Sequence, residues 1–216
     1  MKSLVNILNL DKIKHLEKPT EKHLKKMNAD EGMFKGFDIS QYKANPQPTN
    51  GSLKTKQELK YIQNIPRNEK MIKDTDDVLN YFGDFIKDIG YVFPKDKIDK
   101  ILKDSSKVIL KLKYYYNRPR PDAIADILGM ELDNIFTDTM GTPAYPSGHS
   151  TQGILVALVL SDMYPELRTS LLDLGKKVSF ARLSAKAHYP SDSNFGEELG
   201  VALYKHLVKD RGLKWN

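Results

Sequence analysis

The first segment that could bind an anion runs from Lys111 to Pro119. Lys111 and Arg118 lie seven residues apart, so an α-helix would place them on one face, about two turns apart. Pro119 disfavours helical geometry at Arg118 and predicts that the helix ends there. A guanidinium offers a bidentate fork and an ammonium offers a point charge, and both suit phosphate. Taken by itself, however, this segment is more typical of two surface cations.

A second segment, Pro146-Ser147-Gly148-His149, joins a helix start to a histidine. Ser147 is a preferred type of N-cap residue, and Gly148 leaves room for an anion to approach the backbone. The first free amides of a helix, with the positive end of its dipole, form a natural phosphate cradle. His149 would stand beside this cradle, and its imidazole can titrate near neutral pH. The alternative is a simple capped helix with an incidental histidine.

The third segment contains Arg182, His188 and Asp192. On one continuous helix Arg182 and His188 would point about 120° apart, so they converge only if the chain leaves the helix between them. Pro190 suits the first turn of a new helix and predicts such a break. Asp192 could then accept a hydrogen bond from His188, fix its tautomer and orient the other ring nitrogen for attack. A purely structural His–Asp pair at a helix start is the alternative.

Together the three segments resemble the signature of the phosphatidic acid phosphatase type 2 and vanadium haloperoxidase superfamily. Its motifs are K-x-x-x-x-x-x-R-P, then P-S-G-H, then S-R-x-x-x-x-x-H-x-x-x-D. The resemblance spans roughly residues 51–210. Within the superfamily, the sequence is most similar to the soluble bacterial class A non-specific acid phosphatases. One position departs, because Ala181 stands where the family has a serine before the arginine. The matching residues are Lys111, Arg118 and Pro119, then Pro146, Ser147, Gly148 and His149, then Arg182, His188 and Asp192.

The resemblance implies a phosphatase that hydrolyses phosphate monoesters through a phosphohistidine intermediate. His188, oriented by Asp192, would attack phosphorus, while His149 would protonate the leaving alcohol and later activate water. Phosphate binding is assigned to Lys111, Arg118, Ser147, Gly148 and Arg182. Because side chains supply the cations, we expect no metal and no organic cofactor. We also expect the residues that shape specificity to lie within 120–145, between the first two motifs.

Two other functions remain open at this stage. In the haloperoxidase branch the same anion site binds vanadate as a cofactor and oxidises halide with peroxide, although those chains are much longer. Vanadate would otherwise act only as a phosphate analogue. The second alternative is a phosphate-binding protein without turnover. Ala181 gives this alternative slight support, whereas the two histidines and Asp192 argue against it.

Helices must position these groups, because apolar residues recur at helical spacing and no alternating strand pattern is present. We therefore expect an all-α protein, a single-domain helical bundle. The resemblance implies that this bundle is of the phosphatidic acid phosphatase type 2 or haloperoxidase type. Residues 51–216 form this catalytic domain, and residues 1–50 form a partly helical or irregular N-terminal extension. Gly196 and Gly200 should permit close helix packing. The expected helices are Leu8–Lys26, one from a capping box at Thr55–Glu58, Val78–Ile89, Ile98–Leu112, one from Ser147 or Gly148, Glu166–Lys186 and one from Pro190.

The amino-acid composition limits the classes of molecule that the protein is expected to bind. The 216 residues carry a net charge of +6, which attracts anions, and no cysteine, which excludes disulfides and thiolate zinc sites. The lysines are scattered among acids without aromatic interleaving, so we expect no nucleic acid. The longest apolar run, Ile154–Leu160, is far shorter than the roughly 20 residues of a membrane span. We expect a soluble protein without a clear signal peptide, cytoplasmic rather than periplasmic. Its partner is a small phosphate ester, and a homodimer remains an open option.

Overall fold

The computed structural model describes residues 10–135 and 138–215. Within these ranges the chain forms helices and turns and no β-strand, which confirms the predicted all-α class. None of the described helices has the length and apolar character needed to cross a bilayer. In chain order the α-helices are α2 (Glu21–Asn28), α3 (Ser40–Lys43), α4 (Leu53–Gln63), α5 (Glu69–Asp76), α6 (Val78–Asp88), α7 (Lys95–Tyr116), α8 (Pro121–Ile127), α9 (Gly148–Met163), α10 (Arg168–Ser184) and α11 (Pro190–Lys205).

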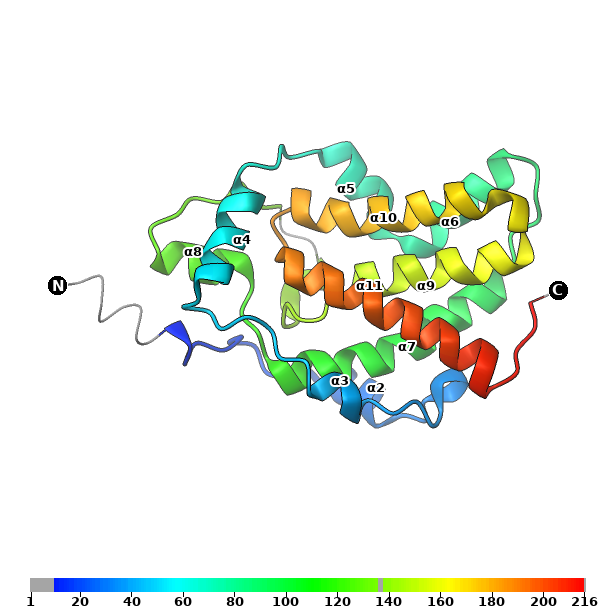
Figure 1. Cartoon of the computed structure of the whole chain (residues 1–216), viewed down its shortest axis with the longest axis horizontal. Coiled ribbons are helices and arrows are strands. Elements are labelled where there is room, and N and C mark those ends of the chain that lie inside the picture. Colours follow the sequence, from blue (N-terminus) through cyan, green and yellow to red (C-terminus); the bar gives the residue numbers. More distant parts are fainter. Residues whose placement is uncertain (1–9, 136–137, 216) are drawn as a thin grey trace.

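Helix α9 lies at the centre of the bundle. It packs against α10, α11 and α7, and every residue from Gly153 to Ser161 is buried (Figure 1). A helix that is apolar on all sides is stable only when other helices enclose it. The start of α9 therefore has a fixed position relative to its neighbours.

Two glycines of α11 allow a very close approach to α9, as predicted. A Cβ atom on Gly196 would lie 2.6 Å from the Ser147 carbonyl oxygen, and one on Gly200 would lie 2.5 Å from that of Thr151. Real Cβ contacts are not this short, so larger residues would push the helices apart. This approach lets the Ser147 amide donate a hydrogen bond to the Asp192 carbonyl at 3.0 Å. The second and third motifs are thus held side by side.

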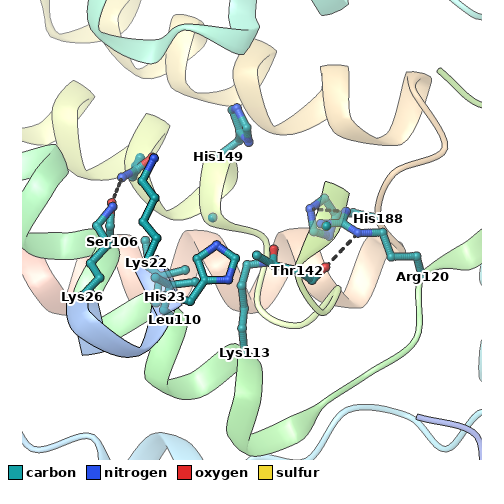
Figure 2. Close-up of a pocket in the computed structure, with 14 residues that line it drawn as sticks. Lys22, His23, Lys26, Ser106, Leu110, Lys113, Arg120, Thr142, His149 and His188 are labelled. Atoms are coloured by element: carbon teal, nitrogen blue, oxygen red, sulfur yellow. Dashed lines mark hydrogen bonds between the residues drawn. The ribbon is translucent and has the colours of Figure 1, made fainter. Parts of the chain in front are cut away.

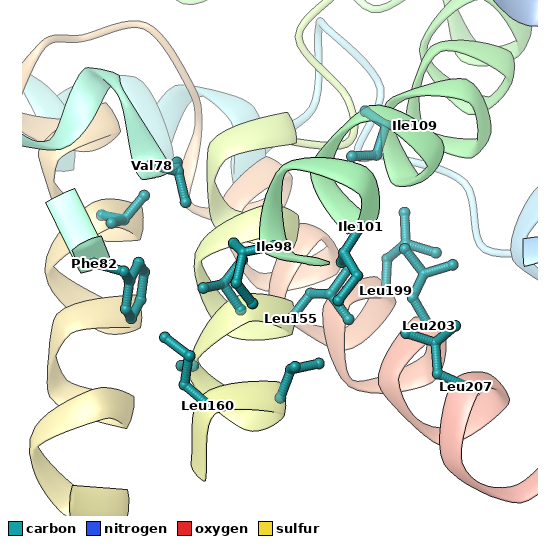
Figure 3. Close-up of a cluster of buried hydrophobic side chains, with 14 of the residues drawn as sticks. Val78, Phe82, Ile98, Ile101, Ile109, Leu155, Leu160, Leu199, Leu203 and Leu207 are labelled. Atoms are coloured by element: carbon teal, nitrogen blue, oxygen red, sulfur yellow. The ribbon is translucent and has the colours of Figure 1, made fainter. Parts of the chain in front are cut away.

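A hydrophobic cluster between α6, α7, α9 and α11 fixes these helices (Figure 3). Phe82, Ile98, Leu155 and Leu199 are all fully buried in it. Burying one such side chain contributes about 1.5–3 kcal/mol to stability. The cluster therefore holds the helices that carry the three motifs in fixed relative positions.

The helices of the second and third motifs begin where the sequence predicts. Helix α9 starts at Gly148 with Ser147 as its N-cap, and α11 starts at Pro190. Helix α10 ends at Ser184, and Lys186 then adopts a left-handed conformation with φ of 56°. The chain therefore leaves the helix before it reaches His188, as the spacing required.

Helix α7 extends beyond the apolar repeat predicted to end at Leu112, and it ends two residues before Arg118, the end predicted from Pro119. Its last helical residue is Tyr116, and Asn117 caps it in the left-handed conformation, with φ of 52°. Asparagine tolerates this conformation better than most residues. The segment from Arg118 to Arg120 therefore runs outside any helix, and Pro121 opens α8.

The predicted capping box at Thr55–Glu58 is wrong. The N-cap of α4 is Ser52, whose hydroxyl accepts a hydrogen bond from the Thr55 amide at 3.1 Å. Glu58 is instead buried and accepts hydrogen bonds from the amide and hydroxyl of Ser191, at 3.0 and 2.8 Å. A carboxylate that was expected to cap its own helix thus ties α4 to the start of α11.

The described part of the first 50 residues packs on the bundle. Phe34 is fully buried in the main cluster, and α2 contacts α7. The helix predicted over Leu8–Lys26 is not continuous: Leu10 is helical, residues 11–20 are not, and α2 begins at Glu21 with Thr20 as its N-cap. Positions 8 and 9 of that prediction lie outside the described residues. The boundary between extension and catalytic domain at residue 50 stays a prediction.

Candidate active site

A cavity of about 310 Å³ opens where α2, α7 and the start of α9 meet the loop before α11 (Figure 2). Pockets for small ligands begin at about this size, so a small molecule would fill it. None of the described residues that line it is acidic. Its titratable lining residues are Lys22, His23, Lys26, Lys113, Arg120, His149 and His188.

The second motif forms one wall of the cavity. The Ser147 hydroxyl accepts a hydrogen bond from the Ser150 amide at 3.3 Å and caps α9. Gly148 and His149 line the cavity, and their amides belong to the first turn, which has no acceptor within the helix. The positive end of α9 is therefore available to an anion.

His188 lies at the other side of the cavity and is 2% exposed. Its Nδ1 is 3.3 Å from Asp192 Oδ2, and its Nε2 is 3.3 Å from Arg120 Nη1. A carboxylate only accepts hydrogen bonds and a guanidinium only donates them. With His188 neutral, Nδ1 therefore carries the proton and Nε2 holds the lone pair. Asp192 is fixed in turn by the Tyr189 amide, which donates to Oδ2 at 2.9 Å.

Burial and the Arg120 charge hold the pKa of His188 well below its ordinary value of 6.5, against the opposing effect of Asp192. Burial raises the pKa of Asp192, but the Arg118 charge and the hydrogen bond with His188 outweigh it and lower that pKa to about 2. The neutral imidazole of His188 is thus hydrogen-bonded to the ionised carboxylate of Asp192. This is the protonation state that a nitrogen nucleophile needs.

His149 has a partner that the sequence did not reveal. Its Nε2 lies 3.0 Å from the carbonyl oxygen of Asp76 and 3.3 Å from Asp76 Oδ1. The same Oδ1 accepts a hydrogen bond from Arg182 Nη1 at 2.9 Å. Burial and the Arg182 charge lower the pKa of His149, while Asp76 raises it. Asp76 was indistinguishable from its neighbours in the acidic run at 74–77.

Arg182, Ser147 and Asp192 lie behind the cavity rather than in its lining. Two of them reach the lining residues through contacts. Asp192 contacts His188, and Arg182 contacts the Asp76 carboxylate, which in turn contacts His149. The structure therefore brings the second and third motifs together as predicted, with some residues in direct reach of a ligand and others supporting them.

The structure does not place Lys111 and Arg118 at the cavity. Lys111 Nζ forms an ion pair with Glu31 Oε1 at 2.5 Å. Arg118 is fully buried, donates to Asp192 Oδ1 at 2.5 Å, and stacks on the Tyr189 ring at 3.8 Å. Arg118 thus holds the carboxylate that orients His188, while Lys111 ties α7 to the N-terminal segment.

Lys113 and Arg120 occupy the cavity instead, and with Pro121 they repeat the K-x-x-x-x-x-x-R-P spacing two residues later. Two residues correspond to about 200° around a helix, so Lys111 and Lys113 point to nearly opposite sides of α7. One signal could have distinguished them: Lys113 lies four residues after Ile109, on the predicted apolar face.

The two cavity cations are buried and crowded. Arg120 Nε donates to the carbonyls of Met140 and Thr142 at 2.9 and 3.0 Å, and Lys113 Nζ donates to that of Pro143. Burial and the Arg120 charge hold the pKa of Lys113 well below its ordinary value. Burial and the Arg182 charge lower the pKa of Arg120 to about 10. A bound anion would relieve this repulsion.

Sequence reasoning also missed Lys22, His23 and Lys26, which reach the cavity from the N-terminal extension. The stretch 120–145 expected to shape specificity does supply Arg120, Gly141 and Thr142, while residues 136–137 of it lie outside the described residues. In the part of the chain that the structure describes, no group of three or more His, Asp and Glu side chains could hold a metal ion.

Comparisons with known proteins identify a family and several relatives. Residues 102–214 match the model of the PAP2 superfamily. The non-specific acid phosphatase of Salmonella typhimurium is 33% identical over 95 residues, which cover 44% of this chain and 38% of the relative. The acid phosphatase of Zymomonas mobilis is 32% identical over 100 residues, which cover 46% and 37%. The non-specific acid phosphatase of Salmonella typhi is 32% identical over 95 residues, which cover 44% and 38%.

The matched part of the chain thus spans less than two fifths of the length of these curated relatives. The family match, in contrast, covers more than half of the chain and includes all three motifs. On this match, and with an all-helical fold that assembles the motifs around one cavity, the chain belongs to the PAP2 superfamily.

Proposed function

We propose that this chain is a metal-independent phosphatase that hydrolyses phosphate monoesters through a phosphohistidine on His188. One observation carries the proposal: the lone pair of His188 Nε2 stands beside Arg120 in a cavity that also holds Lys113 and His149. The acid phosphatases among its relatives support the same class of reaction.

The phosphate would be bound by Lys113, Arg120 and the first-turn amides of Gly148 and His149. A phosphate dianion repels nucleophiles, and phosphoryl transfer depends mainly on positioning and on neutralising that charge. Arg120 would exchange its contact with His188 for one with a phosphate oxygen. In this proposal Lys113 and Arg120 bind the phosphate. The sequence pattern alone assigns this role to Lys111 and Arg118, which match the same motif two residues earlier.

The reaction would proceed in two displacements. In the first, His188 Nε2 forms a bond to phosphorus as the ester P–O bond breaks, and His149 donates a proton to the leaving oxygen. In the second, water attacks phosphorus while His149 takes its proton, and the N–P bond breaks to release phosphate and neutral His188. Asp192 stabilises the positive charge that the imidazole gains between the two steps.

The serine that the family places before the third-motif arginine is Ala181, which is fully buried. Helix α10 supplies another hydroxyl nearby. Ser179 Oγ lies 2.9 Å from Ser150 Oγ, which lies 2.9 Å from Ser147 Oγ. We propose that this hydroxyl chain fixes the N-cap of α9, so that the missing serine affects the rate rather than the reaction class.

The test is hydrolysis of p-nitrophenyl phosphate from about pH 4 to about pH 8, with a chelator present, beside a His188→Ala variant. We expect turnover in the parent, none in the variant, and an acid-labile phosphoryl group on His188 after rapid quenching. Near-normal activity in the variant, or loss with chelator that zinc or magnesium restores, would contradict the proposal.

An inactive parent would direct attention to the two alternatives. Halide oxidation with vanadate and peroxide would identify a haloperoxidase with vanadate as its cofactor. Phosphate affinity without either activity would identify a binding protein. A cytoplasmic location and a homodimer stay predictions that these assays leave aside.

A further inference from the structure

Helix α2 brings three basic side chains to the cavity from outside the three motifs (Figure 2). Lys22, His23 and Lys26 all line it, although they lie in the N-terminal segment and precede the matched residues 102–214. The phosphatase chemistry proposed above uses none of them. Their position therefore requires a separate explanation.

Core packing does not explain the position of α2. None of its residues is buried. A polar contact with α7 anchors the helix, because His23 Nδ1 lies 2.8 Å from the Tyr114 hydroxyl, and the centroids of the two rings are 5.8 Å apart. This contact fixes the register in which Lys22 and Lys26, four residues apart, face the cavity together.

The charges of Lys22 and Lys26 are not neutralised locally. In the described ranges no carboxylate lies within ion-pair distance of either ammonium group. The neighbouring lysines of α7 differ, because Lys107 pairs with Asp104 at 2.8 Å and Lys111 pairs with Glu31. Burial, Lys22 and Lys107 together lower the pKa of Lys26. The positive charges of Lys22, Lys26 and Lys107 therefore lie close enough to repel one another.

These cations are separated from the reactive histidine within the same cavity. In Figure 2, Lys22 and Lys26 lie at one end, His188 and Arg120 lie at the other, and Lys113 lies between them. A ligand with two anionic groups could contact both ends, provided that a short linker joins these groups, because the cavity measures only about 310 Å³.

We propose that Lys22, His23 and Lys26 form a second anion subsite, which binds a second phosphate carried by the leaving group. The inference rests on the proposed phosphatase function for its substrate, although binding alone can test it. It predicts that the protein prefers short bisphosphorylated molecules to monophosphorylated ones. The N-terminal segment then determines specificity by charge, while the motifs perform the reaction.

Binding of non-hydrolysable phosphonates tests the subsite without turnover. Calorimetry would compare short alkane-α,ω-bisphosphonates of increasing length with the corresponding monophosphonates, using the full chain. The test variant is Lys22→Gln with Lys26→Gln. The matched control is Lys18→Gln with Lys25→Gln, which removes the same charge from exposed positions outside the cavity lining.

We expect the parent and the control to bind the best bisphosphonate about tenfold more tightly than its monophosphonate. The test variant should lose this preference and keep its monophosphonate affinity. An undiminished preference in the test variant, an equal loss in the control, or no preference in the parent would each overturn the subsite.

Hydrolysis of alkanediol bisphosphates and monophosphates separates this proposal from the phosphatase proposal. A parent that hydrolyses both, with a test variant impaired only on bisphosphates, supports both proposals. Bisphosphonate preference without any hydrolysis supports the subsite and overturns the phosphatase. Hydrolysis with equal effects of the test variant on both substrate classes supports the phosphatase and overturns the subsite.

Discussion

Arg120 and His188 face each other across 3.3 Å, from guanidinium Nη1 to imidazole Nε2. The two residues are 68 positions apart in the sequence, and both line the cavity. A cation this close to the nitrogen keeps it unprotonated and marks where the oxygens of a phosphate would bind. The nitrogen that we propose as the nucleophile and the cation that we propose to bind the phosphate are thus already side by side in the structure.

Replacing Lys113 or Arg120 with alanine should lower kcat/KM by about 10²–10³, which is typical for one donor to a transition state. Lys111→Ala is the matched control on α7, because Lys111 pairs with Glu31 away from the cavity. It should change kcat/KM by less than about threefold. Initial rates with p-nitrophenyl phosphate would measure both. A larger loss in Lys111→Ala than in Lys113→Ala would indicate that Lys111, rather than Lys113, is the phosphate-binding lysine of the motif.

Arg118→Met should destabilise the protein strongly, because it leaves the fully buried Asp192 carboxylate without its guanidinium partner. Removing one partner of a buried ion pair costs about 3–5 kcal/mol. Urea denaturation would measure the loss. If Arg118 acts by positioning Asp192, Arg118→Lys should recover part of kcat without changing KM. A variant as stable as the parent would show that this ion pair contributes little.

Asp76→Asn should shift the pH dependence of the rate. The carboxylate of Asp76 raises the pKa of His149, so its loss lowers that pKa further. In the proposed mechanism His149 carries a proton in the first step, so the basic limb of the kcat/KM profile should move to lower pH. Asp74→Asn is the control on the same helix, since Asp74 pairs with Lys70 at 2.5 Å. Matching profiles in Asp76→Asn and the parent would remove Asp76 from the acid–base chemistry.

Stability without ligand should fall as the solution becomes acidic. The pKa of His188 in the folded protein lies well below 6.5, so below that pH the unfolded chain binds a proton that the folded chain does not. From about pH 7.5 to about pH 5.5 this single group can remove at most about 1.4 kcal/mol of unfolding free energy, and the loss approaches this limit as the folded pKa falls. His188→Gln should show a correspondingly smaller fall in urea denaturation. Equal pH dependence in both proteins would indicate that folding does not lower the pKa of His188.

The sequence by itself determined the local parts of the site. Ser147 caps α9, Pro190 opens α11, and the chain leaves the helix between Arg182 and His188, all as predicted. Capping and the fixed φ of proline act over a few residues, so the residue types at those positions are sufficient to specify them. The local geometry of the second and third motifs therefore follows from the residue types alone.

Only the tertiary structure decided which residues face the cavity. Both Lys111 and Lys113 satisfy the spacing of the first motif, and the packing of α7 on the bundle places Lys113 inside. Asp76 meets His149 from 73 positions away, and His23 reaches Tyr114 from 91. Such contacts depend on how separate helices pack, whereas periodicity and capping describe each helix alone. The spacing of residues along one helix specifies their relative angle, and only the neighbouring helices decide which angle points toward the site.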